Sequence, residues 1–195
     1  MFTGIIQQIG VVSRIQATGD FGVLEIELTS LPKSVKLGDS ISVNGVCLTA
    51  TSLHENVVSF DVMGITLSKT NLGDLNMKSL VNIEFPMTLT DFVGGHLVQG
   101  HIDEVGTILE IEELTNWRRV RIAVSPQLQK YVVKRGSIAV DGVSLTVSDL
   151  GDLFFEVSLI PATLEHTILG SKQVGNKVNL ESDIVARHLE KLVNS

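Results

Sequence analysis

A cysteine and a serine occupy matching places in two related stretches of this chain. Cys47 lies in GDSISVNGVCLT and Ser144 lies in RGSIAVDGVSLT. Both side chains are small nucleophiles or hydrogen-bonding groups, and in each stretch a threonine follows two residues later. Because alternate residues of a β-strand point to the same face, Cys47 would share a face with Thr49, and Ser144 with Thr146. The pattern predicts one small polar patch in each stretch.

A lone cysteine most often packs as a small apolar side chain, and this ordinary role competes with a chemical one for Cys47. It is the only cysteine, which excludes a disulfide framework within the chain and a multi-cysteine zinc site. Ser144 keeps a polar, nucleophilic atom at the matching place. That agreement favours a role in a site.

Two histidines, His96 and His101, lie in GGHLVQGHID, and each directly follows a glycine. Imidazole titrates near neutral pH, so either side chain could carry a proton. Both could instead be surface residues beside turn glycines. A metal site is disfavoured, because further ligands do not lie nearby. The pattern leaves open which histidine matters more.

An internal repeat relates these stretches and extends along the chain. Cys47 returns as Ser144, TLSKTNLG as TLEHTILG and VNIE as VNLE, each 97 residues later, while Gly4-Ile5-Ile6 is matched by Gly100-His101-Ile102 at a distance of 96. Two copies of about 90 residues each are large enough for separate cores. The expected domains are a first barrel over residues 1–90, a second over 97–183 and a C-terminal oligomerisation helix over 184–195.

Both copies show mostly the periodicity of strands. Asn44-Gly45 and Asp141-Gly142 are strong signals for type I′ turns, whose two central residues need positive φ. Short strands between turns favour a closed barrel, which removes the sheet edges. One short helix is expected in each copy, over residues 66–72 and 163–169, where Pro161 suits a helix entrance. The predicted fold class is mainly β, with two similar antiparallel Greek-key β-barrels in tandem plus a C-terminal α-helix.

The tail changes to a helical period after Asp183, a residue that would cap the helix and could also face a site. Its apolar stripe comprises Ile184, Val185, His188, Leu189, Leu192 and Val193. About ten residues cannot hold a helix alone in water. We expect the stripe to dock, with the identical helix of another chain as its partner.

The formal charge of −7 and the pI of about 5.2 argue against nucleic acid as a partner, because no basic stretch exceeds Arg118-Arg119. No apolar run approaches the roughly 20 residues of a membrane span, and the N-terminus MFTGIIQQIG has neither the basic region nor the long apolar core of a signal peptide. We therefore expect a soluble, cytoplasmic protein without a membrane partner.

The chain resembles the riboflavin synthases of the alpha-chain type over most of its length. The motifs that carry the resemblance are, in order, MFTGI, GDSISVNGVCLT, TLSKTNLGDL, GGHLVQGHIDEVG, RGSIAVDGVSLTV, IPATLEHTILG and VNLESDIVAR. The resemblance implies a homotrimer joined by C-terminal helices, with lumazine synthase as a further partner. It implies a transferase that moves a four-carbon unit between two molecules of 6,7-dimethyl-8-ribityllumazine, giving riboflavin and 5-amino-6-(D-ribitylamino)uracil. No metal or redox cofactor is implied.

The resemblance also implies site residues, in an active site between the first barrel of one subunit and the second barrel of its neighbour. The first-barrel pocket would be lined by Gly4, Ile5, Ile6, Cys47, Leu48, Thr49, Asp61, Val62, Met63, Gly64, Ile65 and Thr66. The second-barrel pocket would be lined by Gly100, His101, Ile102, Arg135, Ser144, Leu145, Thr146, Ile160, Pro161, Ala162, Thr163, Leu164 and Glu165. Phe2 and Thr3 would lie near the reacting centre. Cys47, His101 and Ser144 would activate the nucleophile and move protons, while Asp183 and Thr146 orient the second-barrel ligand.

Three positions depart from the family pattern. Ile65 replaces a carboxylate, Phe85 replaces an arginine, and Arg135 replaces a lysine. The main alternative function is a non-catalytic lumazine or flavin carrier, similar to the lumazine proteins of luminous bacteria, and a purely structural pair of barrels is another. Because both glycine-histidine motifs and both polar pairs are present, the sequence favours the enzyme.

Overall fold

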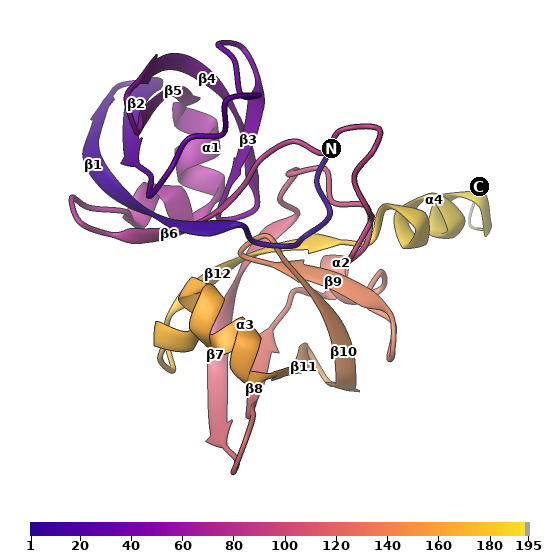
Figure 1. Cartoon of the computed structure of the whole chain (residues 1–195). Coiled ribbons are helices and arrows are strands. Elements are labelled where there is room, and N and C mark those ends of the chain that lie inside the picture. The colour runs from indigo at the N-terminus through magenta and orange to yellow at the C-terminus, as the bar shows by residue number, and fades with distance from the viewer. Residues whose placement is uncertain (194–195) are drawn as a thin grey trace.

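Two closed antiparallel barrels follow one another along the chain, in a computed structural model that describes residues 1–193 (Figure 1). The first barrel contains β1 (Gln8–Thr18), β2 (Phe21–Glu27), β3 (Ser40–Val43), β4 (Val46–His54), β5 (Val57–Met63) and β6 (Leu80–Glu84). The second contains β7 (Glu104–Glu113), β8 (Arg118–Ala123), β9 (Ser137–Val140), β10 (Val143–Gly151), β11 (Phe154–Leu159) and β12 (Lys177–Ser182). Their strand orders are the same Greek key, β1-β2-β5-β4-β3-β6 and β7-β8-β11-β10-β9-β12. The predicted fold class is confirmed.

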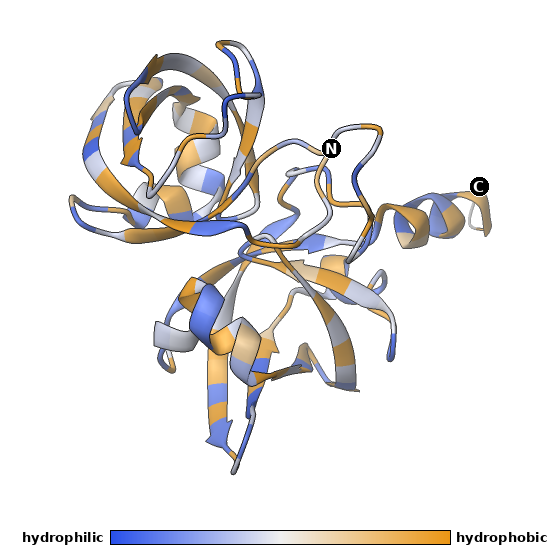
Figure 2. Cartoon of the chain, viewed as in Figure 1, coloured by the Kyte–Doolittle hydropathy of each residue, from blue (hydrophilic) through white to orange (hydrophobic). Residues whose placement is uncertain are grey.

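Each barrel is filled by the inward-pointing residues of its strands, and hydropathy alternates along the ribbon (Figure 2). Leu24 and Ile26 of β2 are fully buried in the first barrel, as is Phe155 of β11 in the second. Burying one such side chain contributes about 1.5–3 kcal/mol. The two cores are separate clusters, so each copy of the repeat packs around its own centre.

The short helices begin earlier than expected and are broken. In place of 66–72 and 163–169, the structure has α1 (Gly64–Lys69) followed by a 3-10 turn η1 (Asn71–Asp74), and α3 (Pro161–His166) followed by η2 (Ile168–Ser171). Thr70 and Thr167 cause the break, because both are extended and their hydroxyl oxygens accept a hydrogen bond from the amide two residues later. Pro161 lies at the helix entrance, as predicted. A further one-turn helix, α2 (Pro126–Gln129), joins β8 to β9.

The two predicted turns meet at the junction of the barrels. Asn44 and Gly45 have φ of +47° and +80°, and Asp141 and Gly142 have the same values. A Cβ on Gly45 would lie 2.6 Å from the amide nitrogen of Gly142, and a Cβ on Gly142 would lie 2.8 Å from that of Gly45. Glycine is therefore required twice over, by the turn and by the contact between the barrels.

The C-terminal helix α4 (Ile184–Val193) projects away from both barrels (Figure 1). Its polar side contacts the second barrel through the ion pairs Arg187–Asp103, at 2.7 Å, and Glu190–Lys130, at 3.3 Å. Residues 194–195, the end of the predicted helical segment 184–195, lie outside the described residues. No helix within residues 1–193 is long and apolar enough to cross a membrane.

Candidate functional site

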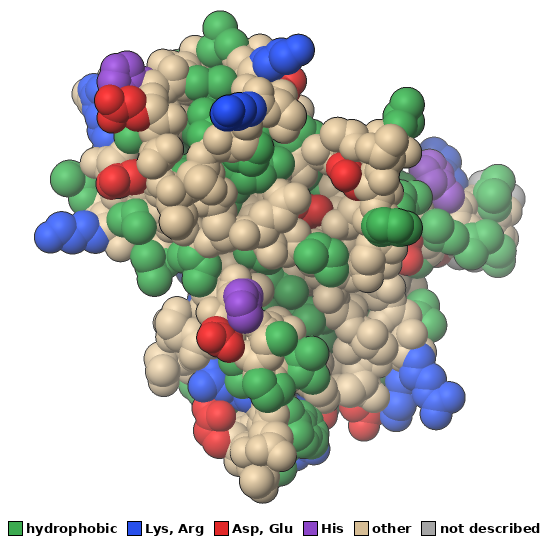
Figure 3. All heavy atoms as spheres, in the orientation of Figure 1, with side chains coloured by type: hydrophobic (Ala, Val, Ile, Leu, Met, Phe, Trp, Pro, Cys, Tyr) green, Lys and Arg blue, Asp and Glu red, His purple; other side chains and the backbone are tan. Residues whose placement is uncertain are grey.

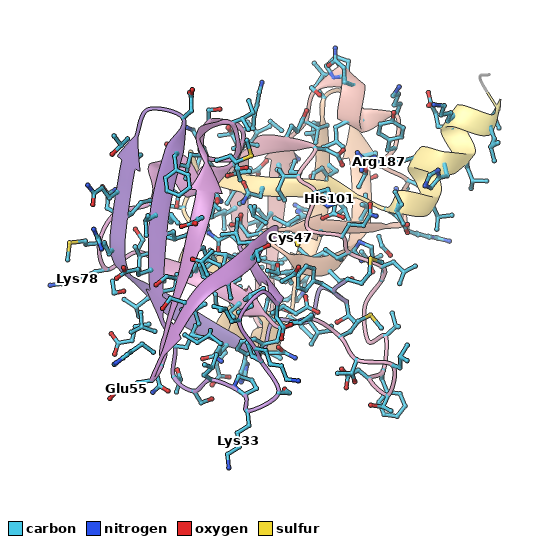
Figure 4. All side chains as sticks on the ribbon, turned by 90° about the horizontal axis from the view of Figure 1, so that it is seen from above. Lys33, Cys47, Glu55, Lys78, His101 and Arg187 are labelled. Atoms are coloured by element: carbon cyan, nitrogen blue, oxygen red, sulfur yellow. The ribbon has the colours of Figure 1, made fainter. Side chains whose placement is uncertain are left out.

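A pocket of about 290 Å³ opens on the outside of the first barrel, where the second half of the chain crosses it. Its walls come from the start of β4, from α1 and from the segment that precedes β7. The lining residues are Val46, Cys47, Ile65, Thr66, Lys69, Thr70, Gly100, His101 and Ile102. Figure 4 shows Cys47 and His101 close to each other between the two barrels.

Cys47 reaches this pocket because it points out of the barrel, while its neighbour Leu48 points into the core. The Cys47 amide donates a hydrogen bond of 3.0 Å to the carbonyl oxygen of Gly100. Gly100 has φ of +82°, and a Cβ there would lie 2.5 Å from the Cβ of Cys47. Only glycine lets the crossing segment lie this close to the thiol.

The same arrangement recurs on the second barrel. The Ser144 amide donates a hydrogen bond of 2.8 Å to the carbonyl oxygen of Gly4. Gly4 has φ of +77°, and a Cβ there would lie 2.5 Å from the Cβ of Ser144. Each barrel therefore presents a small polar side chain beneath a glycine of the other half.

This pairing reverses the expected assignment of the two segments. Gly100-His101-Ile102 was expected on the second barrel but lies on the first, and Gly4-Ile5-Ile6 lies on the second. The cause is a crossing at the junction, where Phe2 and Val98 form an antiparallel bridge through hydrogen bonds of 2.8 and 3.0 Å. Each segment passes the opposite barrel before it enters its own. Accordingly, Ile6 packs on the second core and Ile102 on the first.

Phe2 is fully buried at this crossing, in a small cluster with Val98 and Ala139. Cys47 packs against the same cluster. Phe2 therefore belongs to the packing beneath the crossing and does not line the pocket.

His96 lies beside Ser144. Its Nδ1 is 2.7 Å from the Ser144 hydroxyl oxygen, and its amide donates to the carbonyl oxygen of Thr3 at 3.1 Å. Burial lowers the pKa of the His96 imidazole, and the carboxylate of Asp183 partly raises it. A neutral imidazole hydrogen-bonded to a hydroxyl is the arrangement in which a side chain can accept a proton.

Asp183 caps α4, as the sequence predicts. Its Oδ1 accepts a hydrogen bond of 2.9 Å from the amide of Val185, and its carbonyl accepts one of 3.3 Å from Arg187. Its charge also acts on His96, so the cap and the electrostatic role coexist.

The remaining predicted residues divide by the side of the barrel wall on which they lie. Leu48, Val62 and Leu145 are buried in the cores and do not line the pocket beside Cys47, because they alternate with the outward residues. The residues that lie on the outside, exposed or half-buried, are Thr49, Asp61, Met63, Gly64, Thr146, Ile160, Pro161, Ala162, Thr163 and Glu165. Leu164 packs partly onto the second core.

Arg135 adopts φ of +68°, whereas the matching residue of the first barrel is Gly38, with φ of +88°. This conformation costs a non-glycine residue about 1–3 kcal/mol. The exposed arginine therefore lies on the second barrel at a cost that glycine avoids on the first.

Sequence reasoning missed three pocket residues, Val46, Lys69 and Thr70. Lys69 follows Ile65 by one helical turn and so shares a face with it, and Thr70 directly follows the end of the helix. That signal becomes readable once the helix begins at Gly64. Among residues 1–193, no three His, Cys, Asp or Glu side chains converge as metal ligands would.

The chain is similar to known proteins over nearly its whole length. A family model described as a lumazine binding domain matches residues 3–86 and again 99–183. A riboflavin synthase of Actinobacillus pleuropneumoniae is 48% identical over 99% of this chain and 90% of its own length, and one of Bacillus subtilis is 40% identical over 100% and 90%.

Solved structures are also similar. The crystal structure of LumP complexed with riboflavin has a TM-score of 0.84 at 27% identity, and covers 93% of this chain and 99% of its own. LumP complexed with 6,7-dimethyl-8-(1'-D-ribityl) lumazine gives a TM-score of 0.82 at the same identity and coverage.

Proposed function

Because the chain belongs to the lumazine-binding family as a riboflavin synthase, we propose that each of its two matching polar sites, one on each barrel, holds one molecule of 6,7-dimethyl-8-ribityllumazine. The reaction moves a four-carbon unit from one lumazine to the other, so it needs two like sites for two like ligands. The observation that carries the proposal is the matched pair of sites, with Cys47 beneath Gly100 and Ser144 beneath Gly4.

The reaction requires that one lumazine lose a proton from its 7-methyl group while the other accepts a nucleophile at C7. We assign activation of the nucleophile to Ser144 and His96, because Nδ1 of the buried neutral ring can accept the hydroxyl proton. Cys47 and His101 share the first-barrel pocket and are assigned to proton transfer there. Holding both substrates in place contributes up to about 7–11 kcal/mol in favourable cases.

The neighbouring subunit of a homotrimer completes the site in this proposal. The pocket of about 290 Å³ is at the small end of ligand-sized cavities and is open on one side. On α4, Val185, Leu189, Leu192 and Val193 are more than half exposed. Figure 3 shows hydrophobic side chains on the surface of the projecting C-terminal segment. A second and third copy of α4 would bury this apolar face. Such an assembly would bring the first barrel of one subunit to the second barrel of the next.

Incubation of the purified protein with 6,7-dimethyl-8-ribityllumazine tests the function. We expect riboflavin to form without added metal, at two lumazines consumed per riboflavin, as followed by absorbance and fluorescence. Tight binding of the lumazine without product would instead identify a carrier, and Ile65 and Phe85, which depart from the family pattern, would be the first residues to exchange.

A further inference from the structure

Two glutamates that end matching strands are buried without a cation. Glu84 is the last residue of β6, and Glu181 lies near the end of β12; each is 2% exposed. Within residues 1–193, neither carboxylate forms an ion pair with lysine or arginine. Their hydrogen-bond partners are backbone amides and one hydroxyl.

Glu181 binds the segment that crosses the first barrel. Its Oε1 accepts from the amide of Gln99 at 2.7 Å, and its Oε2 accepts from the amides of Gly100 and His101 at 2.9 and 3.1 Å. Glu181 belongs to the second barrel, but His101 and Gly100 line the pocket of the first.

Glu84 makes the equivalent contacts with the segment that crosses the second barrel. Its Oε1 accepts from the amide and the hydroxyl of Thr3 at 2.6 and 2.8 Å, and its Oε2 accepts from the amide of Gly4 at 3.0 Å. Glu84 belongs to the first barrel, but Gly4 lies on Ser144 of the second. The carbonyl oxygen of Thr3 accepts a hydrogen bond from the amide of His96, and that of Gly4 accepts one from the amide of Ser144. Glu84 therefore holds the backbone that contacts both members of the His96–Ser144 pair.

Each carboxylate organises a short backbone segment although its charge is removed from solvent. Burial raises the pKa of Glu84 and of Glu181 above the ordinary value, in spite of the hydrogen bonds that lower it. For both carboxyl groups, burial is the larger of these two influences on the pKa. What the ionised group provides is geometry, because two oxygens fix three donors of one short segment at once.

We propose that Glu84 and Glu181 are positioning residues, and that each holds, from its own barrel, the backbone that lines the reactive site of the other barrel. The proposal rests on the function proposed above, because that function makes these two sites the reactive ones. The contacts themselves are independent of that function.

Cys47 is the only cysteine of the chain and reports on one of the two sites. The test measures the rate at which the native protein reacts with 5,5′-dithiobis(2-nitrobenzoate), which forms a mixed disulfide on Cys47 and releases one thionitrobenzoate. Glu181→Gln keeps the shape of the side chain but removes the charge and one acceptor. We expect thiol labelling to accelerate about tenfold or more, from the loss of hydrogen bonds to a charged group.

Glu84→Gln is the matched control, since it makes the same chemical change at the equivalent position of the first copy. We expect it to leave the labelling rate of Cys47 unchanged and to lower kcat for riboflavin formation through the Ser144 site. Equal acceleration in both variants would show general loosening and overturn the proposal. So would an unchanged rate in Glu181→Gln.

Circular dichroism verifies folding of both variants. Should either Gln variant unfold, Glu181→Asp and Glu84→Asp replace the pair, because they keep the charge but withdraw the carboxylate by one methylene. The same selective acceleration is expected, and its absence overturns the proposal. Thiol labelling does not depend on turnover, so a protein that forms no riboflavin yet shows selective labelling refutes the proposed function alone.

Discussion

The ring of His96 is buried, and its Nδ1 lies 2.7 Å from the hydroxyl oxygen of Ser144. His101 is exposed in the first-barrel pocket, and its backbone is held by Glu181. The two histidines therefore differ in what they can do. His96 is placed to accept a proton from one defined hydroxyl, whereas the His101 side chain is open to the pocket and to solvent.

Riboflavin formation should fall as the pH falls through the lowered pKa of His96. Burial keeps this imidazole neutral below its ordinary pKa of 6.5, and the imidazolium that finally forms cannot accept the Ser144 proton. The free energy of unfolding should change in the same direction. Because the pKa of His96 is lower in the folded than in the unfolded chain, its contribution to stability is fully present above the pKa of the unfolded chain and is lost as the pH falls through the pKa of the folded chain.

The measurement is kcat against pH, together with the urea midpoint at each pH. His96→Gln keeps a polar group of similar reach but does not titrate, so it should lower kcat and flatten the acid limb of both curves. An unchanged acid limb in this variant would exclude His96 as the proton acceptor.

The sequence alone was enough to predict Cys47, Ser144 and two histidines as candidate site residues, because residue type and repetition suffice to find them. It could not choose between His96 and His101, since the partner of His96 lies 48 residues away and only the fold brings them together. The roles of Glu84 and Glu181 were missed, although the VNIE and VNLE strands carry both at matching places.

Helix α4 projects away from both barrels (Figure 1). None of its residues is buried, and its two ion pairs to the second barrel involve partly exposed side chains. Exposed ion pairs contribute about 0–1 kcal/mol each. A helix of this length needs a partner for its apolar face.

Removal of α4 by a stop after Asp183 should give a folded protein that is monomeric and nearly inactive. The two barrels keep their cores without α4, because no residue of the helix belongs to either. Sedimentation measures the assembly, and riboflavin formation measures the activity. Leu189→Glu, within the intact helix, should reproduce the effect. A trimer that persists in both variants would remove the assembly role of α4.

The strands and their turns were readable from the sequence, because alternation and the Asn-Gly and Asp-Gly pairs are local signals. The starts of α1 and α3 were placed two residues late. Their positions depend on where β5 and β11 end and on the hydrogen bonds of Thr70 and Thr167. Threonine in such a sequence is equally compatible with a continuing helix, so the break is visible only in the structure.

The contact between the barrels is polar and unequal on its two sides. Asp141 is fully buried, accepts from the side chain of Asn71 at 2.7 Å, and pairs with Lys172 at 3.1 Å. The matching positions of the first copy are Asn44 and Leu75, which carry no charge. Burial raises the pKa of Asp141, and Lys172 lowers it.

Lys172→Leu alone should lower the free energy of unfolding by about 3–5 kcal/mol, because it leaves the Asp141 carboxylate buried without its cation. The double variant Asp141→Asn and Lys172→Leu installs the neutral pair that the first copy already uses. It should recover most of that loss. Urea denaturation of both variants measures the difference. A double variant no more stable than the single one would contradict the assignment of the ion pair.

The repeat predicted two barrels from the whole chain, but it could not predict the crossing of the segments. Gly4 and Gly100 are equivalent in sequence, and that equivalence is satisfied whether each segment stays on its own barrel or passes to the other. The choice depends on contacts such as the bridge between Phe2 and Val98. Such contacts lie across the junction and leave no periodic signal.

The crossing also fixes when the enzyme becomes competent during its synthesis. The strands of the first barrel are complete once Glu84 has left the ribosome, and a domain of this kind can then fold on the nascent chain. Its pocket, however, still lacks Gly100 and His101. Gly4 is among the first residues made, but its partner Ser144 has not yet been synthesised. Even where the first barrel folds on a half-translated chain, neither site is finished, and both sites are completed only as the second half emerges.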